Sequence, residues 1–123
     1  MNPELAAMQR QLLQTLAVDS QPVEENQYVH VSEAAARMPS VVGVRLAEEK
    51  PFTGWQIVAT NESPDTAKFG YWSVREIQAE HPAWVLALVL PTGWAFRFTG
   101  NTLIDCVSQI GERHVLKMSV PSS

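Results

Sequence analysis

Near the start of the chain, apolar residues recur every three or four positions. They are Leu5, Met8, Leu12 and Leu16. This spacing places them on one face of an amphipathic helix, which we predict over residues 3–17. Asn2 is suited to cap this helix, because its side chain can accept hydrogen bonds from free backbone amides. We expect the apolar stripe to cover a sheet; the alternative is a contact with a partner or a second copy.

Later in the chain, short apolar segments bounded by polar or turn residues predict strands. They are residues 28–31, 41–46, 54–59, 94–98 and 114–120. Within 54–59, the two-residue period of a strand puts Trp55, Ile57 and Ala59 on one face. Gly43 indicates a bulge or a close approach of another group to the backbone.

Local sequence patterns predict the structure of the remaining regions. Residues 84–90 are all apolar, which predicts a central strand covered on both faces and joined to residues 94–98 as a hairpin. The apolar residues of 99–111 follow a helical spacing, so we prefer a short helix there. Residues 61–70 read as a polar loop.

Two further short helices are expected. Residues 73–80 begin with Ser73 and have Glu76 three positions later, which is the pattern of a capping box. Residues 32–36 carry an alanine run that Pro39 would terminate. The predicted fold class is α+β, a mainly antiparallel sheet of about five or six strands with an N-terminal helix and two or three short helices packed mostly on one face.

The length of 123 residues suits a single domain, residues 1–123. Within it we expect the N-terminal helix in residues 1–18, a linker in 19–27 and the sheet-and-helix core in 28–120. The first residues lack the features of a signal peptide and no apolar run is long enough for a membrane span, so we expect a cytoplasmic protein without a membrane partner.

The acidic residues concentrate in the first half of the chain. Residues 1–65 contain nine acidic and four basic side chains, whereas residues 66–123 contain four and five, for a net charge of −4. Nucleic acid is therefore a poor partner, because phosphate binding needs clustered Lys and Arg. The acidic half is either a solvated surface or a docking patch for a basic partner.

No pattern in the sequence predicts catalysis. His30, His81 and His114 are far apart, without the spacing of a metal site, so no metal and no cofactor are expected. Cys106 lies on the predicted helix among the apolar residues Leu103, Val107 and Ile110 and, as the single cysteine, can form no internal disulfide. The carboxylate pairs occur in predicted polar turns, where water surrounds them. We predict that the chain is not an enzyme.

Four segments resemble a known family in their order and spacing. They are Val31-Ser32, Val42-Gly43-Val44-Arg45, Thr53-Gly54-Trp55-Gln56-Ile57-Val58 and Leu88-Val89-Leu90-Pro91-Thr92-Gly93-Trp94-Ala95-Phe96. Together they are similar to the bacterial immunity protein 33-like domains, over about residues 28–98. The chain departs from the family pattern at Phe52-Thr53, where the family commonly has an acidic residue and a serine.

The resemblance implies a protein that neutralises a bacterial toxin by binding it, without a cofactor and without turnover. On this reading we expect an acidic rim beside the strand that carries Trp55 to meet a basic toxin surface. The candidate partner-binding residues are Glu48, Glu49, Trp55, Glu62 and Asp65.

Two other classes of function stay open. One is a structural or regulatory binding module, which includes the case of a homodimer formed through the N-terminal helix. The other is a small-ligand-binding domain with a pocket between the sheet and the helices.

Overall fold

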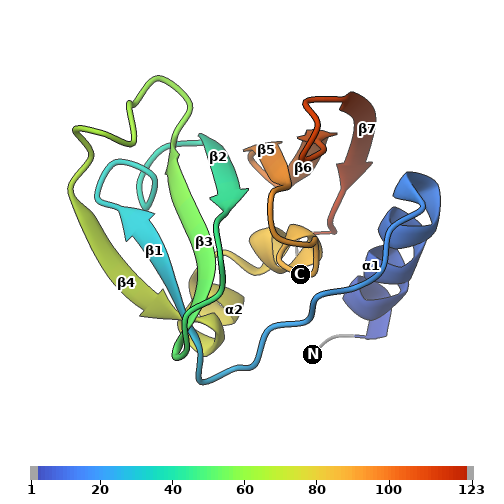
Figure 1. The fold of residues 1–123 in the computed structure, drawn as a ribbon, viewed down its shortest axis with the longest axis horizontal. Helices are drawn as coiled ribbons and strands as arrows, with labels where there is room; N and C mark the ends of the chain where they lie inside the picture. The colour runs from blue at the N-terminus through green and yellow to red at the C-terminus, as the bar shows by residue number, and fades with distance from the viewer. Residues whose placement is uncertain (1–2, 122–123) are drawn as a thin grey trace.

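The fold consists of an N-terminal helix, a seven-stranded sheet and two shorter helical segments (Figure 1). The structure is a computed structural model that describes residues 3–121, so the predicted cap Asn2 lies outside the described residues. The elements are α1 (Pro3–Leu16), β1 (Tyr28–Ser32), β2 (Ser40–Arg45), β3 (Phe52–Ala59), β4 (Phe69–Ser73), α2 (Val74–Glu80), the 3-10 helix η1 (Pro82–Ala87), β5 (Ala95–Thr99), β6 (Thr102–Val107) and β7 (Arg113–Ser119).

The sheet has the strand order β4-β1-β3-β2-β5-β6-β7. Strands β1 and β3 run parallel, and every other neighbouring pair is antiparallel. The α+β class and the mainly antiparallel pairing are as predicted; one parallel pair makes the sheet mixed, and it contains seven strands where five or six were expected. Among residues 3–121, no helix is long and apolar enough to cross a membrane.

The predicted amphipathic helix is present as α1, and its apolar stripe is used inside the molecule. Leu5, Leu12 and Leu16 are buried in the main hydrophobic core. Gln9 also faces inward, where its side-chain amide donates to the backbone carbonyl of Val85 at 2.8 Å. The stripe therefore covers the fold, and its leucines are not available to bind a second copy.

Helix α2 begins as predicted. The Ser73 hydroxyl accepts a hydrogen bond from the Glu76 amide at 3.1 Å, and the Glu76 carboxylate accepts one from the Ser73 amide at 3.0 Å. This reciprocal pair is the capping box. Val74 and Ile77 of this helix are buried in the core.

Residues 84–90 do not form the predicted strand. They belong to η1 and the turn that follows it, where Leu88 and Leu90 donate to carbonyls three residues earlier. Pro82 occupies the first turn of η1, where a missing amide hydrogen costs nothing. The apolar run correctly indicated burial on all sides, but this pattern does not distinguish a buried strand from a buried helix. The predicted hairpin with residues 94–98 was wrong for the same reason.

Residues 99–111 contain strand β6 instead of the predicted helix. Gly100-Asn101 is a two-residue connection between β5 and β6, and Gly100 adopts a φ of 57°. A glycine with positive φ at the first position of a two-residue turn favours a hairpin. The dipeptide was the signal for a strand here, and the helical spacing of the apolar residues concealed it.

Two smaller predictions also require correction. The expected loop over residues 61–70 ends early, because β4 begins at Phe69. Residues 33–37 form successive hydrogen-bonded turns in place of the short helix expected over 32–36.

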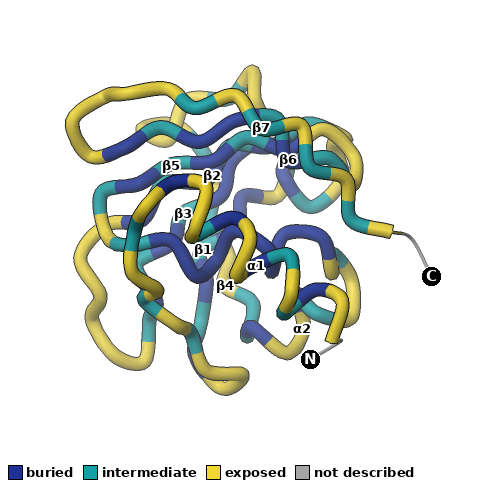
Figure 2. Tube along the Cα trace, turned by 90° about the vertical axis from the view of Figure 1, so that its right-hand side faces the viewer, coloured by how far each residue is buried: buried dark blue, intermediate teal, exposed yellow. Residues whose placement is uncertain are grey.

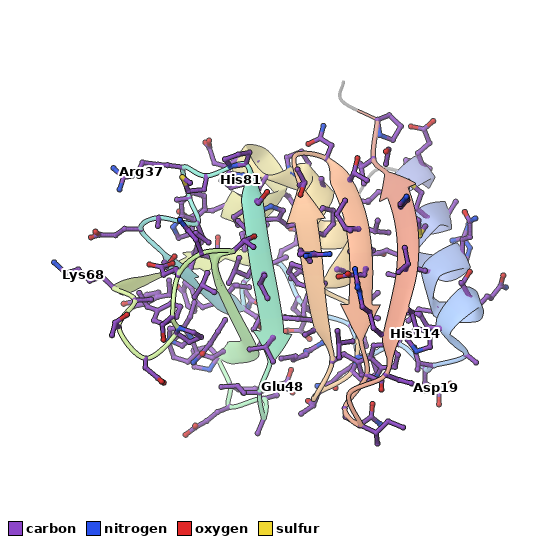
Figure 3. The ribbon with its side chains drawn as sticks, turned by 90° about the horizontal axis from the view of Figure 1, so that it is seen from above. Asp19, Arg37, Glu48, Lys68, His81 and His114 are labelled. Atoms are coloured by element: carbon purple, nitrogen blue, oxygen red, sulfur yellow. The ribbon has the colours of Figure 1, made fainter. Side chains whose placement is uncertain are left out.

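The sheet has two different faces. The face toward α2 and η1 carries the largest buried side chains, among them Trp55, Phe96 and Phe98. Figure 2 shows this buried trace in the middle of the molecule, with exposed trace in the outer loops. Figure 3 looks onto the opposite face, with α2 and η1 behind the strands. We call this opposite face the open face.

Candidate partner-binding surface

The three histidines and the cysteine considered above all lie within residues 3–121. No group of three or more His, Cys, Asp or Glu side chains within this range is placed to hold a metal ion. Cys106 is fully buried, and burial raises the pKa of its thiol to about 12. A thiol that remains protonated and enclosed is not a nucleophile.

The arginine of the Val42-Gly43-Val44-Arg45 segment is completely buried. Its Nη1 donates to the carbonyls of Gln21, Leu88 and Leu90 at 2.6, 3.1 and 2.9 Å, and its Nε donates to the carbonyl of Thr53 at 3.0 Å. One side chain thus joins β3, the segment before β1 and the end of η1. We call these contacts the Arg45 network.

The charge of Arg45 is only partly compensated. Its Nη2 has no hydrogen-bond partner within residues 3–121 and lies 3.7 Å from the Glu48 carboxylate. Burial lowers the pKa of Arg45, and the nearby negative charge of Glu48 partly offsets that shift. Glu48 therefore acts within the chain as the counter-charge of a buried guanidinium.

Trp55 belongs to the same buried region. Its side chain has no exposed surface, its ring lies 5.7 Å from the Arg45 guanidinium carbon, and its indole nitrogen donates to the Leu88 carbonyl at 3.0 Å. The face shared by Trp55, Ile57 and Ala59 is the buried face, as predicted. In this conformation the Trp55 side chain has no surface to offer a partner.

The other glycine and tryptophan positions of the resemblance also serve the interior. A Cβ on Gly43 would lie 2.3 Å from the Phe96 ring, which identifies the close approach expected at this glycine. Gly54 adopts a φ of 94°, and a Cβ there would lie 2.2 Å from the Leu46 carbonyl oxygen. Trp94 is buried in the core. The shared motif residues thus build the fold.

On the open face, the strands β4, β1 and β3 carry a group of aromatic side chains. We call this group the aromatic surface, and it consists of Tyr28, His30, Phe52, Phe69 and Tyr71. Strand pairing places Tyr71 directly opposite His30 and Phe69 opposite Ser32. Tyr71 is 61% exposed. The described core contains none of the five.

These rings contact one another in a continuous layer. His30 and Phe52 are stacked, with centroids 4.7 Å apart and planes at 13°. Tyr71 meets Tyr28 and Phe52 edge to face, at 5.3 and 5.7 Å. Such contacts hold the rings in a defined arrangement while leaving one side accessible to solvent. Sequence reasoning missed this surface because β4 was not predicted as a strand, and its first two residues were placed in a loop.

The predicted acidic residues lie at the two ends of β3, beside the aromatic surface. Glu48 and Glu49 precede the strand, and Glu62 and Asp65 follow it, so the two pairs lie beyond opposite ends of a strand that is roughly 23 Å long. Figure 3 shows Glu48 at its end of the sheet. The four carboxylates flank the strand as expected, but they do not form one cluster.

Two of these carboxylates have structural partners. Glu62 accepts hydrogen bonds from the buried Ser32 hydroxyl at 2.6 Å and from the Ala59 amide at 3.1 Å. Glu48 accepts one from the Gln27 side chain at 3.2 Å, in addition to its pairing with Arg45. Glu49 and Asp65 are exposed, and their carboxylates are the more available of the four.

The remaining half of the open face has a different character. On β5, β6 and β7, the buried carboxylate of Asp105 pairs with Arg97 at 2.8 Å and with Arg113 at 2.7 Å. This half therefore presents arginine side chains, whereas the half formed by β4, β1 and β3 presents aromatic rings.

Comparison with known proteins identifies one family. The model of a family described as the Imm33-like domain matches residues 8–109. This range is wider than the resemblance over residues 28–98, since it also includes most of α1 and all of β6. Searches of curated proteins and of solved structures found no match.

Proposed function

The chain belongs to the family of Imm33-like domains, and we propose that it is an immunity-type protein that binds and neutralises a cognate bacterial toxin in the cytoplasm without catalysing a reaction. The family name supports a role in immunity and a protein as the partner.

The observation that carries the proposal is the aromatic surface. Outward positions of a sheet with one solvated face are ordinarily polar. Here the outward positions of three adjacent strands carry rings, and Tyr71 remains 61% exposed. Tyrosine and other aromatic residues are enriched where proteins bind one another, because they supply a large rigid area at little entropic cost. We therefore assign the centre of the toxin-binding surface to these rings.

The acidic ends of β3 would form the rim of this surface. Glu49 and Asp65 are exposed on either side of the rings, and the first half of the chain carries most of the acidic residues. A basic toxin would be attracted to such a surface over a distance, which raises the association rate at low salt. Trp55 contributes indirectly, because it anchors β3 from the buried face.

Neutralisation is tested by expressing a candidate toxin, the product of a gene adjoining that of this chain, with and without this chain in a sensitive bacterium. We expect the chain to restore growth and to form a stoichiometric complex with the purified toxin. An adjoining product that is toxic but is neither bound nor neutralised would contradict the proposal.

The rim is tested separately with the double variant Glu49→Lys/Asp65→Lys. We expect a slower association rate and a weaker dependence of that rate on salt, with little change in dissociation. Glu112→Lys is the matched control, because Glu112 is an exposed carboxylate just before β7, on the other half of the sheet. An unchanged association rate in the double variant would remove the rim from the proposal.

A further inference from the structure

The two edges of the sheet are built differently. Edge strand β7 contains Arg113, His114 and Lys117, Lys117 adopts a φ of 53°, and the pairing of β7 with β6 is interrupted by a shift in register. Charges and bulges of this kind discourage another strand from pairing with an edge. Edge strand β4 reads Phe69-Gly70-Tyr71-Trp72-Ser73, has no charged residue, and pairs with β1 in an uninterrupted register.

Strand β4 also borders a surface open to a partner on each of its two faces. Phe69 and Tyr71 point to the aromatic surface on the open face. Gly70 and Trp72, at the alternate positions, line a hollow of about 450 Å³. The other residues that line this hollow are Val31, Glu33, Ala36 and Arg37. Figure 3 shows Arg37 and Lys68 on this flank of the molecule, apart from each other.

We propose that an extended segment of the cognate toxin adds to the sheet as an eighth strand along β4. This inference rests on the proposed function and specifies how the toxin is held. Alternate side chains of an added strand point to opposite faces, so one set would pack on the aromatic surface and the other would enter the hollow. The hollow would take an apolar side chain beside Trp72, with Glu33 and Arg37 available to polar neighbours.

A second copy of this chain fits the same edge less well. In an antiparallel pair of two β4 strands centred on Tyr71, the residues on the hollow side would be Gly70 and Trp72 of the second copy. Gly70 has no side chain to insert, and Trp72 already contacts His81 of its own chain at a centroid distance of 5.6 Å. In that register Lys68, directly before β4, would also face the start of α2 in the second copy, where Arg75 is the second helical residue.

Gly70 allows the hollow to be filled without disturbing the fold. A Cβ on Gly70 would meet no atom within 4 Å, and its φ lies outside the positive range. A leucine there would therefore project into the hollow, and a side chain in place of glycine favours a strand. We expect Gly70→Leu to unfold at the same temperature as the unaltered chain or at a higher one. Val115→Leu is the control, because Val115 is an exposed residue on the opposite edge strand.

The experiment is a titration of the purified cognate toxin with the unaltered chain, Gly70→Leu and Val115→Leu, together with hydrogen exchange of the complex. We expect Gly70→Leu to weaken binding at least tenfold, Val115→Leu to leave it unchanged, and the amides of β4 to exchange more slowly in the complex.

Equal binding by Gly70→Leu, without added protection of β4, would overturn the strand-addition proposal and leave the immunity function standing. If the unaltered chain does not bind the toxin, the proposed function fails first, and the strand addition fails with it. A chain that sediments as a dimer, and becomes a monomer in Gly70→Leu, would assign the edge to a second copy and also overturn the proposal.

Discussion

In the part of the sheet formed by β4, β1, β3 and β2, the two faces carry different kinds of side chain, although their residues alternate along the same strands. On the buried face, Trp55 and Arg45 are neighbours, and their side chains donate hydrogen bonds to backbone carbonyls of three separate segments. On the open face, Phe52 and Tyr71 contact other rings and solvent. The family motif thus lies mainly on the first face. We infer that the motif specifies the scaffold and that the aromatic residues specify the partner.

The largest loss of stability should come from removing the side chain of Arg45, at the centre of the buried face. Arg45→Ala would leave the carbonyls of Gln21, Thr53, Leu88 and Leu90 without this donor, so we expect a loss of about 3–5 kcal/mol in the free energy of unfolding. Denaturant unfolding measures this. The control is Arg75→Ala, because Arg75 makes an exposed ion pair with Glu25 and should contribute little. Equal stability of Arg45→Ala and Arg75→Ala would show that the network is not needed.

A smaller loss is expected at Gly43. Gly43→Ala would place a methyl group 2.3 Å from the nearest atom of the Phe96 ring, and relieving that overlap should cost about 1–3 kcal/mol. Gly70→Ala is the matched variant, because the same methyl group meets no atom there. Thermal unfolding of the pair should show a lower midpoint only for Gly43→Ala. A similar midpoint for both would mean that the ring moves aside freely.

On the open face, a substitution should weaken toxin binding more than it lowers stability. Tyr71→Ser removes a largely exposed ring together with its two edge-to-face contacts, so we expect a loss of only about 0.5–1.5 kcal/mol in the free energy of unfolding. Toxin binding should weaken by at least tenfold, or about 1.4 kcal/mol, since exposed aromatic residues dominate such surfaces. Calorimetric titration measures the affinity. A variant that is destabilised but binds normally would place Tyr71 with the scaffold and not with the partner surface.

The smallest expected effect is on the pH dependence of stability, and it comes from His81 at the edge of the buried face. His81 stacks on Trp84 at 4.0 Å, and burial lowers its pKa, an effect that Glu80 and the Ala36 carbonyl partly oppose. Because the folded state favours the neutral ring, His81 supports stability above pH 6.5, and this support is lost as the pH falls through its lowered pKa. His81→Phe should therefore lose less stability than the unaltered chain between about pH 6.5 and pH 5. Parallel pH dependences would contradict this role.

Sequence reasoning succeeded where the local pattern and the tertiary structure agree. The spacing of Leu5, Leu12 and Leu16 predicted α1, and Ser73 with Glu76 predicted the start of α2. These signals depend on residues within a few positions of each other. Their contacts therefore exist whichever strands become neighbours.

Prediction from the sequence failed where one local pattern fits two structures and the tertiary structure decides between them. Residues 84–90 are buried on all sides, and burial alone does not separate a 3-10 helix from a strand. Arg45 gave no sign in the sequence that it would be buried, because its partners are backbone carbonyls of distant segments. The aromatic surface likewise required the pairing of β1 with β3 and β4, which no local spacing encodes.

The most direct test of the account is to map the toxin-contacting amides of the chain by nuclear magnetic resonance, with isotope-labelled chain and unlabelled cognate toxin. We expect the perturbed amides to gather on β4, on β1 and at the start of β3, and those of α1, β6 and β7 to remain unchanged. Perturbations concentrated on α1 or on the arginine-bearing half of the open face would contradict the claim that the aromatic surface binds the toxin.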